Sequence, residues 1–136
     1  MRKRIQGRVI ANRLPYSNVF GPIAGEAAYR CGDEYMDSLL AYLRHNFEFV
    51  NEFCEKELNT VRMVRAEGTY LAWLDFRGTG LECKEINRRI LEQAKIAVDP
   101  GEWFGEEGRG FARFSLACGM DMVKEAMGRL KEIFQI

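Results

Sequence analysis

One arginine, Arg113, stands in the middle of a short apolar segment, residues 111–117, soon after a loop punctuated by glycines. The segment alternates as a β-strand does, so that Phe111, Arg113 and Ser115 share one face. The other face carries only apolar side chains and is predicted to join the core. Because a guanidinium stays charged in a protein, Arg113 must find an anion. The face that carries Arg113 thus combines one aromatic and two polar side chains, as a surface that faces a ligand would.

Two kinds of anion could pair with Arg113, and the residues leave both alternatives open. The first is a carboxylate of the chain itself, and Asp75, near the end of a predicted neighbouring strand, is the natural candidate. The second is a carboxylate carried by a ligand, which a guanidinium binds through two parallel charge-assisted hydrogen bonds. In the second case Arg113 would fix the orientation of the ligand as well as its affinity.

Helices are predicted where apolar residues recur every three or four positions. One such stripe starts at residues 21–22, a Gly-Pro pair, and runs past residue 50, either as one helix or as two broken at Gly32, with Asp33 capping the second. A further helix is predicted around residues 83–94. The last helix is predicted to start from an N-cap at Asp121 and to bury Val123, Met127, Leu130 and Phe134.

Strands are predicted over residues 60–65, 69–76, 96–98 and 111–117. The second of these is apolar on both faces, which places it in the middle of a sheet and predicts cover on both sides. Helices and strands in this order define an α+β fold, a small and mostly antiparallel sheet packed with helices. The sheet carries more aromatic surface than it can easily hide, from Tyr70, Trp73, Phe104 and Phe111. We expect part of this surface to face a partner.

Composition excludes several classes of protein. A chain of 136 residues is expected to form one domain, and its 20 basic and 20 acidic residues give no net charge to attract nucleic acid or an acidic membrane surface. Residues 1–8 are basic, which suggests either a nucleic-acid arm or, as the alternative that the charge balance favours, a solvated helical segment or the cut edge of a longer chain. No apolar run is long enough to cross a bilayer.

Motifs for metal or phosphate chemistry are weak. The four cysteines, widely spaced and with no C-x-x-C pair, predict reduced thiols in a cytoplasmic protein, and the single histidine, His45, has no second metal ligand near it. The glycines of residues 101–110 precede a strand rather than a helix, and three glutamates among them would repel an anion, so we expect a flexible or tightly turned loop instead of a phosphate cradle. The chain shows no nucleophile beside a base and no metal cluster. No catalytic residue is assigned.

Four stretches resemble a known family: residues 29–37, 42–46, 67–75 and 100–113. They are similar to the C-terminal small domain of fold-type I pyridoxal-phosphate enzymes, the class I/II aminotransferases, and within these to the cystathionine β-lyase-like C–S lyases of the MalY/PatB group. The resemblance begins at about Leu14. It implies that residues 21–136 form an aminotransferase-like small domain and that residues 1–20 are the edge of a longer chain.

The resemblance implies roles for particular residues. In this family the small domain closes over a larger domain that holds pyridoxal 5'-phosphate, and the arginine matched by Arg113 binds the α-carboxylate of the amino-acid substrate, here a cystathionine-like one. Thr69, Tyr70 and Phe104 would lie near the pocket. The Schiff-base lysine and the phosphate-binding residues of the family precede the matched region, and Lys3 lies in the wrong context to be that lysine. We therefore expect a homo-oligomer whose cofactor domain is missing here, with no cofactor bound to this chain alone and no activity. The alternative is a non-catalytic amino-acid-binding or dimerisation module derived from the same fold.

Overall fold

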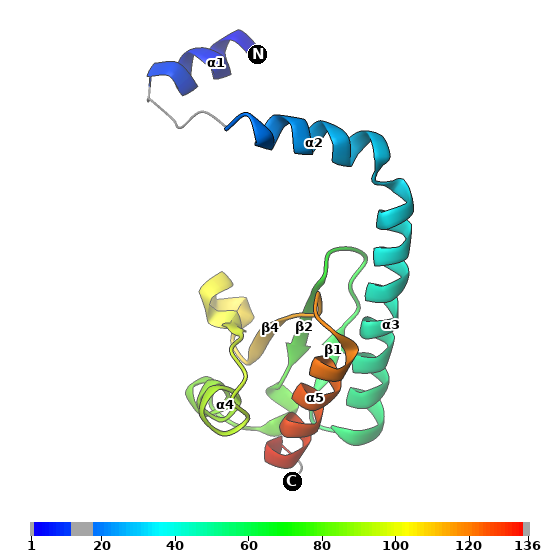
Figure 1. Cartoon of the computed structure of the whole chain (residues 1–136). Helices are drawn as coiled ribbons and strands as arrows, with labels where there is room; N and C mark the ends of the chain where they lie inside the picture. Colours follow the sequence, from blue (N-terminus) through cyan, green and yellow to red (C-terminus); the bar gives the residue numbers. More distant parts are fainter. Residues whose placement is uncertain (1, 12–17, 135–136) are drawn as a thin grey trace. The chain divides into compact units, whose positions relative to one another are not determined.

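The computed structural model describes residues 2–11 and 18–134 (Figure 1). The chain divides into two compact units after Ser38. In the first unit, helix α1 (Arg2–Ala11) and helix α2 (Phe20–Cys31) bury no residue. The basic start of the chain is thus an exposed helix over residues 2–11. The rest of the predicted N-terminal segment lies partly outside the described residues.

The apolar stripe forms two helices in series, which settles the alternative left open by the sequence. Helix α2 ends at Cys31 and helix α3 (Asp33–Glu57) begins after Gly32. A side chain at position 32 would bring its Cβ within 2.3 Å of the Ala28 carbonyl oxygen, so the break requires glycine. Asp33 is the first residue of α3 instead of the cap before it, and its charge still favours the positive end of the helix.

The sheet has four antiparallel strands in the order β1-β2-β4-β3, which confirms the predicted fold class. The strands are β1 (Arg62–Val64), β2 (Leu71–Asp75), β3 (Asp99–Pro100) and β4 (Phe111–Ser115). The strand predicted over residues 96–98 is wrong. The Ile96 amide donates to the Ile90 carbonyl at 3.0 Å, which closes the end of the preceding helix, and the chain reaches the sheet only at Asp99.

Every helix of the second unit packs its apolar side against the same face of the sheet. Helix α4 (Cys83–Arg88), which continues into a π-turn (Arg89–Gln93), and helix α5 (Met120–Phe134) share one core with the end of α3. On the sheet this core takes in Ala72, Leu74, Ala112 and Phe114. The side chains predicted to be buried in α5 are buried, although α5 begins at Met120, so that Asp121 lies in its first turn.

The opposite face of the sheet, here called the outer sheet face, carries no α-helix among residues 39–134. It is formed by Arg62, Val64, Leu71, Trp73, Asp75, Asp99, Phe111, Arg113 and Ser115. These side chains are half-buried or exposed. The expected cover on both sides of β2 is therefore found on one side only: the α-helices among residues 39–134 are absent from this face, and Trp73 is covered in part by the Phe104 ring. Among residues 2–11 and 18–134, no helix combines the length and apolarity needed to span a membrane.

Candidate functional site

Arg113 lies at the centre of the outer sheet face. Strand β4 places it directly opposite Trp73 of β2 on one side and Asp99 of β3 on the other. The predicted alternation is confirmed: Ala112 and Phe114 are buried, while Arg113 is 34% exposed. The strand thus turns its apolar residues to the helices and its guanidinium to the accessible side.

The carboxylate that pairs with Arg113 belongs to Asp99. The Arg113 Nε and Nη2 both donate to Asp99 Oδ2, at 3.0 and 2.7 Å. The sequence-based candidate, Asp75, is wrong because its carboxylate is occupied by Arg77, whose Nε donates to Oδ1 at 2.9 Å and whose Nη2 donates to Oδ2 at 2.7 Å. These hydrogen bonds from Arg77 hold the pKa of Asp75 below its ordinary value of 3.8. The Arg113–Asp99 pair is not sealed from solvent, since the Asp99 side chain is 40% exposed.

Aromatic rings connect the two ion pairs across the outer sheet face. The Arg113 Cζ lies 4.5 Å from the centre of the Phe104 ring, and the Arg77 Cζ lies 4.5 Å from that of Phe111. Between these rings lies Trp73, edge-on to Phe104 and stacked on Phe111, with both centroid distances 5.5 Å. Each guanidinium therefore has an aromatic platform as well as a carboxylate partner, an arrangement that restricts its orientation.

The glycine-rich loop positions Phe104 and forms no anion cradle. It folds as two 3₁₀ turns, Gly101–Phe104 and Glu106–Gly108. The backbones of Gly101 and Gly108 touch, because a Cβ on Gly101 would lie 2.1 Å from the Gly108 carbonyl oxygen. Of the two alternatives that the sequence left open, a flexible or a tightly turned loop, the structure has the second, and this loop brings Phe104 back over the strand that carries Arg113.

The other two pocket residues expected from the sequence, Thr69 and Tyr70, lie just before β2. The Tyr70 carbonyl accepts a hydrogen bond from the Leu116 amide at 2.8 Å, and its side chain is 50% exposed. Thr69 has a φ of +69°, which is rare for a β-branched residue, and lines a separate hollow beside α3. The structure thus brings Phe104 into contact with Arg113, while Thr69 and Tyr70 lie beyond the central contacts of Arg113.

Asp99 is the residue of this site that sequence reasoning missed. The pairing of β3 with β4 brings it there: Asp99, which directly precedes the Pro-Gly turn, lies opposite Arg113, the third residue of the strand after the loop. The register of β3 against β4 could not be predicted from the length of the loop, because the loop contains two 3₁₀ turns that a simple hairpin would not have.

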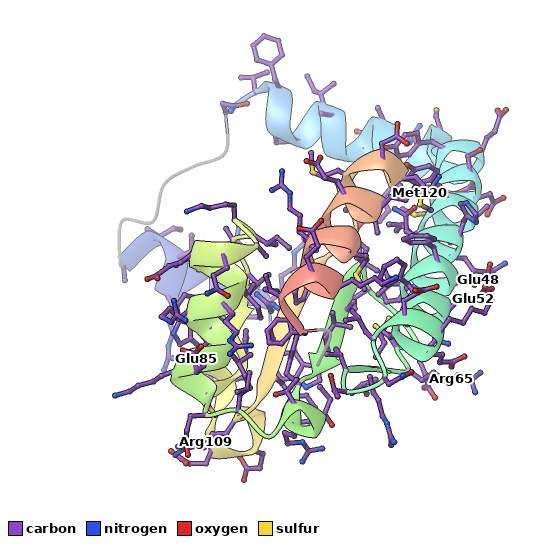
Figure 2. All side chains as sticks on the ribbon, turned by 90° about the horizontal axis from the view of Figure 1, so that it is seen from below. Glu48, Glu52, Arg65, Glu85, Arg109 and Met120 are labelled. Carbon is purple, nitrogen blue, oxygen red and sulfur yellow. The ribbon has the colours of Figure 1, made fainter. Side chains whose placement is uncertain are left out.

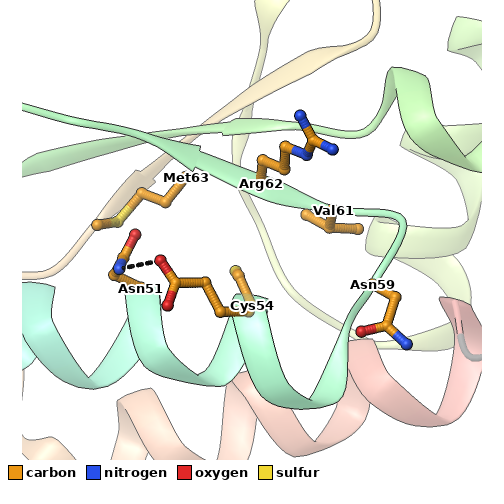
Figure 3. A pocket seen from close by; sticks show the side chains of 7 residues that line it. Asn51, Cys54, Asn59, Val61, Arg62 and Met63 are labelled. Carbon is orange, nitrogen blue, oxygen red and sulfur yellow. Dashed lines mark hydrogen bonds between the residues drawn. The ribbon is translucent and has the colours of Figure 1, made fainter.

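A second hollow, of about 370 Å³, lies between the end of α3 and β1 (Figure 3). Cys54 lines this hollow, and its thiol is a potential nucleophile. Burial raises the pKa of the thiol to about 11, and the nearby charge of Glu55 adds a smaller effect in the same direction. At neutral pH the thiol is protonated and a poor nucleophile. Within the part of the chain that the structure describes, no group of three or more histidine, cysteine, aspartate or glutamate side chains could hold a metal ion.

The outer sheet face does not fit pyridoxal phosphate as a complete site. The cofactor needs a lysine for its Schiff base and a cradle of donors for its phosphate. The outer sheet face carries two arginines, Arg62 and Arg113, and no lysine, and the backbone contact of Gly101 with Gly108 leaves no room for a phosphate inside the loop. The residues that the face does offer, a guanidinium with aromatic neighbours, suit a carboxylate.

Comparison with known proteins gives the same class of fold. The family model for aminotransferases of class I and II matches residues 6–130. Cystathionine beta-lyase PatB of Bacillus subtilis is 32% identical over 130 residues, which cover 96% of this chain and 34% of that protein. Protein MalY of Escherichia coli is 32% identical over 117 residues, covering 86% of this chain and 30% of MalY. The crystal structure of cystalysin from Treponema denticola, which contains pyridoxal 5'-phosphate, matches with a TM-score of 0.87 at 28% identity, over 96% of this chain and 33% of cystalysin.

The fold, a helix-backed antiparallel sheet, is thus shared with cystalysin, whose structure contains pyridoxal 5'-phosphate. The chain belongs to the aminotransferase class I and II family, and its relatives include C–S lyases, as the resemblance implied. It spans about a third of the length of these curated relatives.

Proposed function

We propose that this chain is the small domain that binds the substrate carboxylate in a pyridoxal-phosphate-dependent C–S lyase or aminotransferase, and that Arg113 is the group that binds it. The observation that carries the proposal is the partly exposed Arg113 side chain at the centre of the outer sheet face, whose guanidinium is engaged by Asp99 along one edge only. A carboxylate held there by paired hydrogen bonds would fix one end of an amino-acid substrate. Phe104 supports that position by its contact with the guanidinium. Thr69 and Tyr70, which lie just before β2, are proposed to be near the substrate without contacting Arg113.

We further propose that the cofactor domain and its lysine are contributed by residues outside this sequence, so that the 136-residue chain is inactive alone. The shared length, a third of PatB and MalY, supports this assignment. The partners are then a cofactor-binding domain, a cystathionine-like amino acid and, in the assembled enzyme, a second copy. The cytoplasm is the proposed location, consistent with four free thiols.

Inactivity is tested by mixing the purified chain with pyridoxal phosphate. We expect no stable absorbance band of a lysine Schiff base and no release of product from L-cystathionine. A stable band accompanied by turnover would show that the chain carries its own cofactor site.

Carboxylate binding is tested by titrating the ¹⁵N-labelled chain with sodium acetate at constant ionic strength, with acetamide as the neutral ligand. We expect acetate, and not acetamide, to shift the NMR signals of the outer sheet face. Arg113→Ala should abolish these shifts. Arg109→Ala is the matched control, because Arg109 lies nearby in sequence and pairs with Glu106 at the surface (Figure 2). Unchanged acetate binding in Arg113→Ala would remove Arg113 from the site.

A second candidate function, a free-standing amino-acid-binding or dimerisation module, is favoured by one observation. Trp103 and Phe104 are 71% and 51% exposed, which is more aromatic surface than a monomer usually shows. Calorimetry with L-alanine and acetate separates the two functions. A complete amino-acid site would bind L-alanine more tightly than acetate, whereas half a site would gain nothing from the ammonium group.

A further inference from the structure

We propose that Asp99 is a positioning residue for the carboxylate site: it holds the Arg113 guanidinium by one edge, so that the Nη1–Nη2 edge is the one presented to the ligand. The inference rests on the proposed role of Arg113. It adds to that role a residue and a direction of approach.

The geometry assigns the two edges of the guanidinium differently. Nε and Nη2, which form its side edge, both donate to the single oxygen Oδ2 of Asp99. Nη1 makes no hydrogen bond to another residue of the described ranges 2–11 and 18–134. A guanidinium has five N–H donors, and Asp99 uses two of them. One N–H of Nη1 and the second N–H of Nη2 remain as a parallel pair with the spacing that a carboxylate accepts.

A second contact fixes the plane of the guanidinium. The Phe104 ring lies beneath it at 4.5 Å, and this ring is itself held edge-on by Trp73. Because Asp99 holds one edge of the guanidinium and Phe104 covers one face, the rotation of the Arg113 side chain is already restricted. Little further entropy is therefore lost when a ligand binds. The remaining edge is therefore oriented before a ligand arrives.

The neighbouring ion pair, Arg77 with Asp75, differs from the Arg113 pair in how its carboxylate is engaged. Arg77 engages both oxygens of Asp75, and its backbone amide donates to Oδ1 at 2.9 Å as well. In that pair each carboxylate oxygen has a donor. In the Arg113 pair, Oδ1 of Asp99 has no hydrogen-bond partner among the residues that the structure describes. Both arginines use the same Nε–Nη2 edge, so the two pairs differ in the carboxylate: Asp99 holds Arg113 through one oxygen only, whereas both oxygens of Asp75 are engaged by Arg77. The Arg113 pair is also the one that strands β3 and β4 place at the centre of the outer sheet face.

A competing role for Asp99 predicts the opposite effect and is the alternative that the experiment must exclude. If Asp99 occupied the place of the ligand, it would have to leave before a carboxylate could bind, and its removal would strengthen binding. If Asp99 positions Arg113, the two carboxylates use different edges, and its removal weakens binding.

The test is the acetate titration of the 136-residue chain, followed through the backbone amide signals of the outer sheet face in every variant and, where Arg113 is present, through its Nε–Hε signal. We expect Asp99→Ala to raise the dissociation constant roughly three- to tenfold, the range that one charge-assisted hydrogen bond contributes at a half-exposed position. Asp99→Asn keeps an oxygen that can accept from Nε and Nη2, so it should restore most of the affinity. In Asp99→Ala the Nε–Hε signal should also move upfield and broaden before any acetate is added.

The outcomes separate this inference from the proposed function. If Arg113→Ala abolishes acetate binding while Asp99→Ala leaves it unchanged or tightens it, the positioning role of Asp99 is overturned and the carboxylate site remains. If Arg113→Ala has no effect either, the carboxylate site itself is wrong. Equal weakening by Asp99→Ala and Asp99→Asn would also contradict the positioning role, because the charge of Asp99 would then matter and not its hydrogen bonds.

Discussion

At the scale of single residues, Asn46 joins helix α3 to the end of the strand that carries Arg113. Its side chain is fully buried, and its Nδ2 donates to the carbonyl oxygens of Leu116 and Cys118 at 2.8 and 3.1 Å. The Tyr42 hydroxyl, one turn earlier on α3, accepts from the Met120 amide at 2.8 Å. The turn between β4 and α5 is thus fixed by side chains of a helix about 70 residues earlier in the sequence.

Asn46→Ala should lower the free energy of unfolding by about 1–3 kcal/mol, because the Leu116 carbonyl loses its donor at a buried position and the Cys118 carbonyl loses one at a partly buried position. Urea unfolding followed by circular dichroism measures the change. Asn51→Ala is the matched control, since Asn51 donates to Glu55 at 2.8 Å on the surface of the same helix. Its effect should stay within about 0.5 kcal/mol. Equal losses in the two variants would mean that the burial of Asn46 contributes nothing.

At the scale of elements, the connection from β3 to β4 is the part of the fold most sensitive to a single added carbon. Its two 3₁₀ turns meet where the Gly101 and Gly108 backbones touch, and a Cβ on Gly101 would also lie 2.7 Å from the Phe111 carbonyl oxygen. These neighbours are backbone atoms, so they can move only if the loop itself moves. The same loop carries Phe104 to Arg113.

Gly101→Ala should therefore destabilise the protein by about 1–3 kcal/mol, as overpacked sites do. It should also weaken the near-ultraviolet circular dichroism of Trp73, whose ring contacts Phe104. Gly128→Ala in α5 is the control: nothing lies within 4 Å of its added Cβ, and the helix should gain about 0.5–1 kcal/mol. An unchanged near-ultraviolet spectrum in Gly101→Ala would show that the loop does not hold Phe104 in place.

The elements that the sequence predicted well are those whose pattern is local. The buried face of α5 and the two faces of β4 follow from spacing within one segment, and both are confirmed. The missing cover on β2 could not be predicted in this way. An apolar strand face indicates burial, but whether a helix, a ring such as Phe104 or another chain covers it is decided by tertiary packing.

The partner of Arg113 could not be predicted either, for a related reason. Asp75 and Asp99 are both near strands that flank β4, and the choice between them depends on register and on competition. Asp75 lies two residues before Arg77 and is taken by it. The spacing of Asp75 and Arg77 in the sequence already indicates this competition. The register of β3, by contrast, depends on how the loop folds.

At the scale of the whole molecule, equal numbers of acidic and basic residues make individual ion pairs the main source of pH dependence. Hydrogen bonds from Arg88 and Arg89 lower the pKa of Glu85 on α4 from its ordinary 4.5 to about 2. The pKa of Asp75 is lowered as well, chiefly by the hydrogen bonds from Arg77. A carboxyl group whose pKa is lower in the folded chain stabilises the fold above its ordinary pKa. That contribution is lost as the pH falls through the folded value.

Stability should therefore decrease between about pH 4.5 and pH 2, and Glu85→Gln should flatten this part of the profile. Because an amide does not titrate, the variant should be less stable than the parent chain at neutral pH, and the two melting temperatures should converge near pH 2. The measurement is thermal unfolding in buffers of constant ionic strength. Glu48→Gln on α3 is the control for removing a carboxylate, since Glu48 is exposed and forms no ion pair among the residues that the structure describes (Figure 2). Parallel profiles for Glu85→Gln and the parent chain would show that the pairing of Glu85 with Arg88 and Arg89 does not contribute to acid stability.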